Sequence, residues 1–208
     1  ALGAQTFTTA TEAFNVAVGF QAGSTISTGS NNTLVGGLTG DALTTGQENV
    51  AMGRNALTSD TKGQQNVALG NGALQSQNFT TATNSLNTAV GYIAGVSVTT
   101  GLYNTLIGAS AGSLLTDADQ NVAIGLNALG SDTKGSFSVA VGTSALAAQN
   151  FATAFDTYNS AVGLNAGLSI TTGASNTIVG ALAGDALTNA DFNVAIGRSA
   201  LTDDTLGS

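Results

Sequence analysis

Carboxylates are the side chains of this sequence that are most capable of chemistry. The 208 residues include 12 Asp and Glu against 4 Lys and Arg, with no His and no Cys. Without imidazole or thiol groups the chain lacks the usual general base, a thiolate nucleophile and a zinc-binding set. We therefore expect no enzyme, no cofactor and no bound metal. Four basic residues also cannot neutralise a phosphate backbone, which argues against nucleic acid as a partner.

Several of these acids recur at a fixed interval. Asp60, Asp132 and Asp204 follow one another every 72 residues, so they occupy one position of a repeat. We expect them to be solvated turn residues. Segments 59–63 and 131–135 share the order Ser-Asp-Thr-Lys-Gly, which suits a local ion pair or an Asx-type turn.

Other charged residues are weaker candidates for a site. Calcium at Asp117 and Asp119 is an alternative, but the Gly-Gly-x-Gly-x-Asp pattern of calcium-binding β-rolls is absent. Arg54 and Arg198 share one repeat position. We expect them to be exposed charges, and an ion pair between chains is the alternative.

Three aromatic residues also recur at one repeat position, namely Phe7, Phe79 and Phe151. One interpretation places them on a protruding loop as a surface contact for a ligand. The other, which we favour, folds the ring back so that it packs beside the roll.

All of these residues are positioned by a short repeat. A nine-residue motif, Asn-x-small-aliphatic-Gly-x-x-Ala-(Gly or Leu), occurs eleven times at spacings of 17, 17, 17 and 21 residues. The chain is therefore one continuous array: a partial fourth coil over 1–14, blocks over 15–86 and 87–158, and a truncated block over 159–208. The motif starts at Asn15, Asn32, Asn49, Asn66, Asn87, Asn104, Asn121, Ser138, Asn159, Asn176 and Asn193.

Seventeen residues suit one coil of a β-solenoid with two short strands and two turns. The fourth motif residue is apolar in every unit and is predicted to face inward, while the third, usually Ala, is predicted to face outward. The motif Asn residues are expected to form a hydrogen-bonded ladder with a gap at Ser138. With about 4.8 Å per coil the rod is roughly 50–60 Å long, and carboxylates 72 residues apart lie roughly 19 Å apart, too far for paired acid–base catalysis.

Glycine fills the fifth motif position in all eleven units. We expect a backbone angle or a close approach there that excludes a Cβ. These residues are Gly19, Gly36, Gly53, Gly70, Gly91, Gly108, Gly125, Gly142, Gly163, Gly180 and Gly197.

The motif strings resemble a known family. Segments 15–19, 121–125 and 193–197 read Asn-Val-Ala-Val-Gly or Asn-Val-Ala-Ile-Gly, and they resemble the SVAIG-type repeats of YadA-like trimeric autotransporter adhesin heads. Segment 87–95 is also similar to repeats in phage and viral tail fibres. The resemblance implies an all-β, left-handed parallel β-roll with three chains side by side. A narrow roll of small residues also buries little per coil, which favours lateral association.

The function expected from these features is that of a structural and adhesive surface fibre. It would contact an unidentified host receptor, protein or glycan, through repeated outer turns, outside the cell on a bacterial surface or a virion. Alternatives are a phage tail fibre segment, a receptor-free self-assembling filament and an ice-binding solenoid. Thr-rich segments 8–11 and 80–83 prompt the last, but they recur once per block and not once per coil. The sequence contains no run of 18 apolar residues, so we expect no membrane insertion in this segment. No signal peptide is evident.

Overall fold

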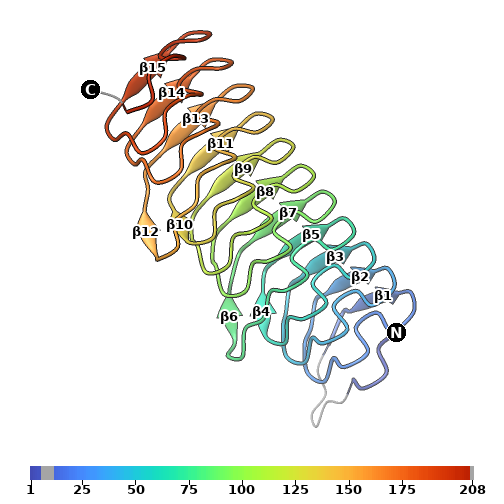
Figure 1. Ribbon diagram of the computed structural model, residues 1–208. Coiled ribbons are helices and arrows are strands. Elements are labelled where there is room, and N and C mark those ends of the chain that lie inside the picture. The colour runs from blue at the N-terminus through green and yellow to red at the C-terminus, as the bar shows by residue number, and fades with distance from the viewer. Residues whose placement is uncertain (6–11, 207–208) are drawn as a thin grey trace.

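The protein is a stack of coils, each of which contributes one strand to a common sheet (Figure 1). The computed structural model describes residues 1–5 and 12–206. Within these residues it is all-β, so the predicted β-solenoid is confirmed. Eleven three-residue strands form one parallel sheet. They are β1 (Val16–Val18), β2 (Thr33–Val35), β3 (Val50–Met52), β5 (Val67–Leu69), β7 (Thr88–Val90), β8 (Thr105–Ile107), β9 (Val122–Ile124), β11 (Val139–Val141), β13 (Ser160–Val162), β14 (Thr177–Val179) and β15 (Val194–Ile196).

The four extra residues of each fourth coil leave this sheet in register. Ala68 of β5 pairs with Ala89 of β7 just as Ala17 pairs with Leu34. The extra length is taken up on the opposite side of the rod, where two small parallel sheets form (Figure 1). Their strands are β4 (Gly63–Gln64) with β6 (Thr83–Asn84), and β10 (Gly135–Ser136) with β12 (Phe155–Asp156).

The prediction of two strands in every coil is therefore wrong. A second strand is present where a third coil meets an expanded fourth coil. In the other described coils the return segment is a series of turns. The residue before each motif adopts a left-handed backbone, for example Asn31 with φ 59° and Gln120 with φ 57°. This residue separates the return segment from the main strand in every coil, including the coils with a second strand.

The inward and outward faces of the main strands are the reverse of the prediction. The third motif residue is the buried one, as Ala51, Leu106 and Ala140 show with no exposed surface. The fourth residue faces out, and Ile107 and Val162 are 37% and 41% exposed. Alternation along a strand identifies which residues share a face, but not which face is covered. The buried position is Ala in eight coils and Leu34, Leu106 or Ile178 in the other three, whereas the Val, Ile, Leu or Met at the fourth position faces out.

The core explains the four-coil block. In the first two coils of a block the ninth motif residue is Gly and a large aliphatic residue follows three positions later, as with Gly23 and Ile26. In the next two coils the ninth residue is Leu and the later one is polar, as with Leu57 and Asp60. Both Ile26 and Leu57 are fully buried. These two positions thus give each coil one large aliphatic side chain, and the second coil of a block adds another at the third motif position, such as Leu34.

Space rather than backbone angle selects glycine at the ninth position. Gly23 and Leu57 have nearly the same left-handed φ, 58° and 53°. A Cβ on Gly23 would lie 2.8 Å from Cδ1 of Leu34 and 2.9 Å from Cδ1 of Ile26. Leu at this position is accommodated where the facing strand residue is Ala.

Glycine at the fifth motif position is required for both of the predicted reasons, the backbone angle and the close approach. Gly91 has φ 141°, a region that residues with a Cβ rarely enter. Its added Cβ would also lie 2.5 Å from the carbonyl oxygen of Gly108 in the next coil. The coils therefore approach each other closely at this corner.

Candidate functional site

The motif asparagines form a buried hydrogen-bond ladder along the rod. Asn49 Nδ2 donates to Asn32 Oδ1 at 3.1 Å and to the carbonyl of Gly63 at 3.0 Å. The Asn49 backbone N–H also donates to Asn32 Oδ1. The same side-chain contact joins Asn32, Asn66, Asn104, Asn176 and Asn193 to the preceding Asn. The ladder follows the prediction and locks the stacking register.

Block boundaries change the partners of the ladder. Asn87 Nδ2 donates to Gln77 Oε1 at 2.9 Å, while the hydroxyl of Ser85 takes its place on Asn66 Oδ1 at 2.9 Å. The fourth coil thus brings two polar side chains, Gln77 and Ser85, into the core, and both find partners there.

The gap predicted at Ser138 is filled in the same way. Gln149 Nε2 donates to Ser138 Oγ at 2.8 Å, and the hydroxyls of Ser138 and Thr157 share a hydrogen bond. The Ser138 backbone N–H still donates to Asn121 Oδ1 at 2.8 Å. The ladder therefore has a substitute at this coil and no opening.

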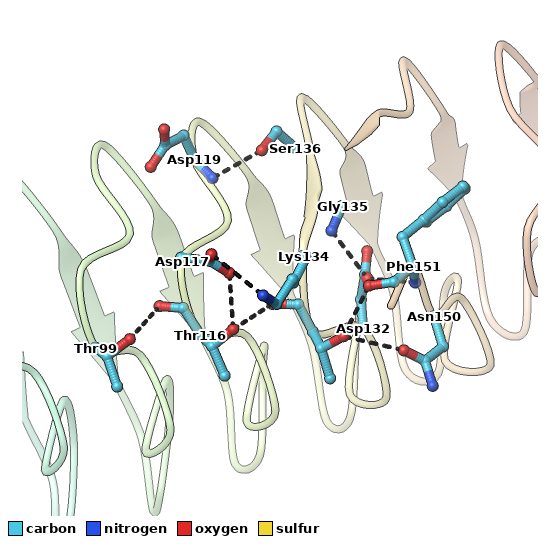
Figure 2. Close-up of polar contacts among 11 residues, drawn as sticks. Thr99, Thr116, Asp117, Asp119, Asp132, Lys134, Gly135, Ser136, Asn150 and Phe151 are labelled. Carbon is cyan, nitrogen blue, oxygen red and sulfur yellow. Dashed lines mark hydrogen bonds and ion pairs between the residues drawn. The ribbon is translucent and has the colours of Figure 1, made fainter. Parts of the chain in front are cut away.

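Two of the recurring acids are buried, which corrects their prediction as solvated turn residues. Asp132 is fully buried. Its Oδ1 accepts hydrogen bonds from the backbone N–H groups of Gly135 and Phe151, each at 3.1 Å (Figure 2), and its Oδ2 accepts from Gln149 Nε2 at 2.6 Å. Asp60 has the equivalent partners. The bond between Asp132 and the residue three positions later closes this turn, one residue beyond the reach of the predicted Asx turn.

The lysine of this turn pairs with a different coil. Lys134 Nζ lies 3.5 Å from Asp117 Oδ2 of the preceding coil, and Thr116 donates to Asp117 Oδ1 at 2.9 Å (Figure 2). The expected ion pair within the turn is therefore not formed. Partial burial raises the pKa of Asp117, but the hydrogen bond from Thr116 and the charge of Lys134 outweigh it and hold that pKa below its usual value.

Asp119, the other acid considered for calcium, accepts a hydrogen bond from the backbone of another coil. Its Oδ1 accepts a hydrogen bond from the N–H of Leu102 at 2.7 Å. Burial, together with the nearby charge of Asp117, raises the pKa of Asp119 despite this bond. Within residues 1–5 and 12–206 no three acids gather into a group that could hold a metal ion.

A row of hydroxyl side chains follows the rod and was missed from the sequence. Thr99 donates to the carbonyl of Thr116 at 3.2 Å, and Thr116 donates to the carbonyl of Thr133 at 3.0 Å (Figure 2). The signal in the sequence was a Ser or Thr twelve positions after the motif start in nine of the eleven units, with Asn in the other two. The row consists of Ser27, Thr44, Thr61, Asn78, Thr99, Thr116, Thr133, Asn150, Thr171, Thr188 and Thr205.

The recurring phenylalanines are packed where the structure describes them. Phe79 and Phe151 are each 7% exposed, so we do not retain them as surface contacts. Phe151 stacks on Phe155 with ring centroids 4.9 Å apart. Phe155 itself is exposed, on the loop that carries β12. Phe7 lies outside the described residues.

The largest unexplained surface is the outer face of the eleven-stranded sheet. Its centre consists of the second and fourth motif residues, and one row borders it on each side. The leading row consists of Phe14, Asn31, Glu48, Gln65, Leu86, Tyr103, Gln120, Phe137, Tyr158, Ser175 and Phe192. The trailing row consists of Phe20, Gly37, Arg54, Asn71, Tyr92, Ala109, Leu126, Thr143, Leu164, Ala181 and Arg198.

The centre of this outer sheet face is mostly apolar, and its borders mix aromatic, polar and charged residues. Tyr92 and Tyr158 are 61% and 57% exposed at its borders, and Val18, Met52 and Val179 are exposed at its centre. Eleven strands at about 4.8 Å and six residue intervals at about 3.3 Å give an area on the order of 1,000 Å². The largest apolar patch on a typical monomer is about 300–600 Å². The face therefore has the size and composition of an interface.

Both arginines of the chain lie in the trailing row and are exposed. Lys134 with Asp117 is the one ion pair among the described residues, so neither Arg54 nor Arg198 has an acidic partner there.

The described part of the chain contains no surface pocket, and none of its elements is a helix that could cross a membrane. No family model, curated protein or solved structure matches this chain.

Proposed function

We propose that this chain is a rigid segment of a homotrimeric adhesive fibre on a cell or virion surface. The observation that carries the proposal is the outer sheet face, which covers about 1,000 Å² on each copy and has a mostly apolar, exposed centre. Stable protein interfaces bury about 800 Å² per partner. A second copy of the same chain is the occupant that matches this face in length, because both rods repeat at the same coil spacing.

The trimeric state and the left-handed winding are proposed from the resemblance of the motif strings to YadA-like adhesin heads. A ring of three copies covers the face of each copy with the faces of two others. The chain contributes the repeated coil, and the inner ladder of Asn side chains stiffens each copy independently of its neighbours.

Adhesion is proposed to use loops on the opposite side of the rod. The loops that carry β6 and β12 project beyond the neighbouring coils (Figure 1). They lie 72 residues apart in the sequence, or about 19 Å along the rod for four coils. Three copies with several loops each would bind a repetitive receptor by avidity, in which many weak contacts add up.

Light scattering on face variants tests the self-association. Ile107→Lys combined with Val162→Lys places charges on the outer sheet face, and we expect the particle mass to fall to that of one chain. Leu114→Lys is the matched control, because Leu114 is 47% exposed but lies outside the face. The control is expected to keep the mass of the parent protein. Equal masses for the parent and the face variant would refute the proposal.

A binding assay tests adhesion separately. Parent protein and a variant lacking residues 152–155, which restores a 17-residue coil, are compared on immobilised polysaccharides and matrix proteins. We expect the parent to bind at least one of these surfaces and the shortened variant to bind it more weakly. A parent protein that binds none, while still associating with itself, would favour a receptor-free filament.

The hydroxyl row favours a second candidate, an ice-binding solenoid, because it carries one residue per coil along the rod. Its hydroxyl protons are already donated to backbone carbonyls, and Asn78 and Asn150 interrupt the Thr series. Thermal hysteresis of the parent solution, lost on Thr116→Val, would establish this function. Unshaped ice crystals would remove it.

A further inference from the structure

The loop that carries β12 presents an exposed aromatic ring on a buried support. Phe155 is 46% exposed, and its ring lies parallel to that of the buried Phe151, with centroids 4.9 Å apart and an interplanar angle of 0°. The backbone N–H of Phe151 donates in turn to the buried carboxylate of Asp132 at 3.1 Å. Because Phe151 covers one face of the Phe155 ring, the opposite face and the ring edge account for the exposed surface.

The first block builds the same loop without this ring. β6 pairs with β4 as β12 pairs with β10, and Thr83 takes the position of Phe155 opposite a glycine. Phe79 is as buried as Phe151, at 7% exposure, and its backbone N–H donates to the equivalent carboxylate of Asp60. The ring at position 155 is therefore not required to form the expanded coil. Its exposure indicates a contact outside the chain.

The surroundings of the ring restrict the kind of partner. The three residues before it, Ala152, Thr153 and Ala154, are small and exposed, so no long side chain shields the ring. A stable protein interface needs about 800 Å² per partner, whereas one aromatic side chain buries about 150–250 Å². The ring therefore suits a ligand that binds through one flat apolar face and that repeats along a polymer, so that many weak contacts add up.

A β-linked chain of glucopyranose or N-acetylglucosamine has this form. The substituents of these sugar rings are equatorial, so axial C–H bonds cover both faces and make them apolar. The hydroxyl and amide groups lie at the ring edge, where they stay hydrated. The protein has a net charge of −8, and the exposed Asp156 follows Phe155 directly, so an acidic polysaccharide would be repelled. The ligand class is therefore a neutral glycan.

We propose that Phe155 is a stacking platform for a neutral β-linked glucan or chitin-type chain, with Phe151 as its support. The proposal rests on the adhesive function proposed above and names its ligand class and its contact residue. The loop lies on the side of the rod opposite the eleven-stranded sheet, so a second copy on the outer sheet face leaves the ring open (Figure 1).

A tryptophan substitution reports the contact directly, because the natural chain contains no tryptophan. In Phe155→Trp the indole keeps a flat platform, and titration with cellohexaose or chitohexaose should shift its emission to shorter wavelength and protect it from acrylamide quenching. Leu114→Trp is the matched control, because Leu114 is 47% exposed and lies on another coil. Its emission should not change. Unchanged emission of Phe155→Trp with both oligosaccharides would overturn the proposal.

Exchange between the two loops isolates the ring from the rest of the coil. Phe155→Thr copies the first loop, and we expect the affinity for immobilised chitohexaose, measured by column retention, to fall about tenfold. Adding Thr83→Phe should return the affinity to within about twofold of the parent, because Phe79 lies where it can support the new ring. Circular dichroism checks that each variant keeps the β-solenoid. Equal retention of the parent and Phe155→Thr would overturn the proposal, as would a double variant that stays as weak as Phe155→Thr.

The outcomes separate this proposal from the function on which it rests. A parent protein that binds neither oligosaccharide but binds an immobilised matrix protein overturns the platform and leaves adhesion standing. A parent protein that binds no surface at all overturns both.

Discussion

Two adjacent glycines are expected to respond in opposite ways to the same substitution. Gly36 is a fifth motif residue with φ 144°, and its added Cβ would lie 2.6 Å from the carbonyl oxygen of Gly53 and 2.6 Å from Thr39 Oγ1. Gly37 follows it in the chain, its φ is not positive, and nothing lies within 4 Å of its added Cβ. Comparing alanine variants of Gly36 and Gly37 therefore separates the effect of close coil stacking from the effect of replacing a glycine.

The expected magnitudes follow from these geometries. Gly36→Ala forces a residue with a Cβ into an unfavourable backbone region, at about 1–3 kcal/mol. The contacts with the next coil add about 1–3 kcal/mol of overpacking. Together they lower the free energy of unfolding by about 2–6 kcal/mol. Gly37→Ala should raise it by about 0.4–1 kcal/mol, because alanine restricts the unfolded chain.

Thermal unfolding followed by circular dichroism, at one protein concentration, measures the difference. For a chain of this size 1 kcal/mol corresponds to a shift in Tm of about 2–4 °C. Gly36→Ala should therefore lower Tm by roughly 4–24 °C, and Gly37→Ala should leave it unchanged or slightly raised. Equal shifts for the two variants would refute the close approach of coils at this corner.

Three further outcomes are expected. Asp132→Leu leaves two buried N–H groups and the amide of Gln149 without their acceptor, and it should lower the free energy of unfolding in chemical denaturation by about 3–5 kcal/mol. The control Asp203→Asn, at an exposed position, should change it by less than about 0.5 kcal/mol. The charge of Asp156 raises the pKa of Tyr158 above its usual 10.0, so Asp156→Asn should lower that pKa in a residue-selective NMR titration, and an unchanged pKa would contradict the contact. Leu129→Ala removes a fully buried side chain and should cost about 2–5 kcal/mol, and a cost below 1 kcal/mol would contradict its place in the core.

Repetition made much of the fold predictable. The 17- and 21-residue spacings give the number and order of coils, and the recurring Asn gives the ladder that holds them in register. The four extra residues that follow Gln77 and Gln149 were also visible, but not the polar contacts that these two glutamines make inside the coil. Those contacts join residues from successive coils, as with Gln149 and Asp132, and their geometry depends on stacking.

The direction of the faces could not be predicted from one chain. Val18 and Ala17 alternate in the expected way, but hydrophobicity alone placed the larger side chain inside. That reasoning fails when the outer face is itself apolar. The signal of the true core was a pair of repeat positions that change together. Where Gly23 and Ile26 stand in one coil, Leu57 and Asp60 stand in another, so one large aliphatic side chain is kept at this pair of positions.

The central claim is that copies of this chain cover each other along the outer sheet face. The molar mass in solution, measured by light scattering after size-exclusion chromatography, tests it most directly. A single chain has a mass of 20.3 kDa. A trimer predicts about three times that value, held constant as the protein is diluted through the micromolar range. A mass of one chain at every concentration would contradict the account.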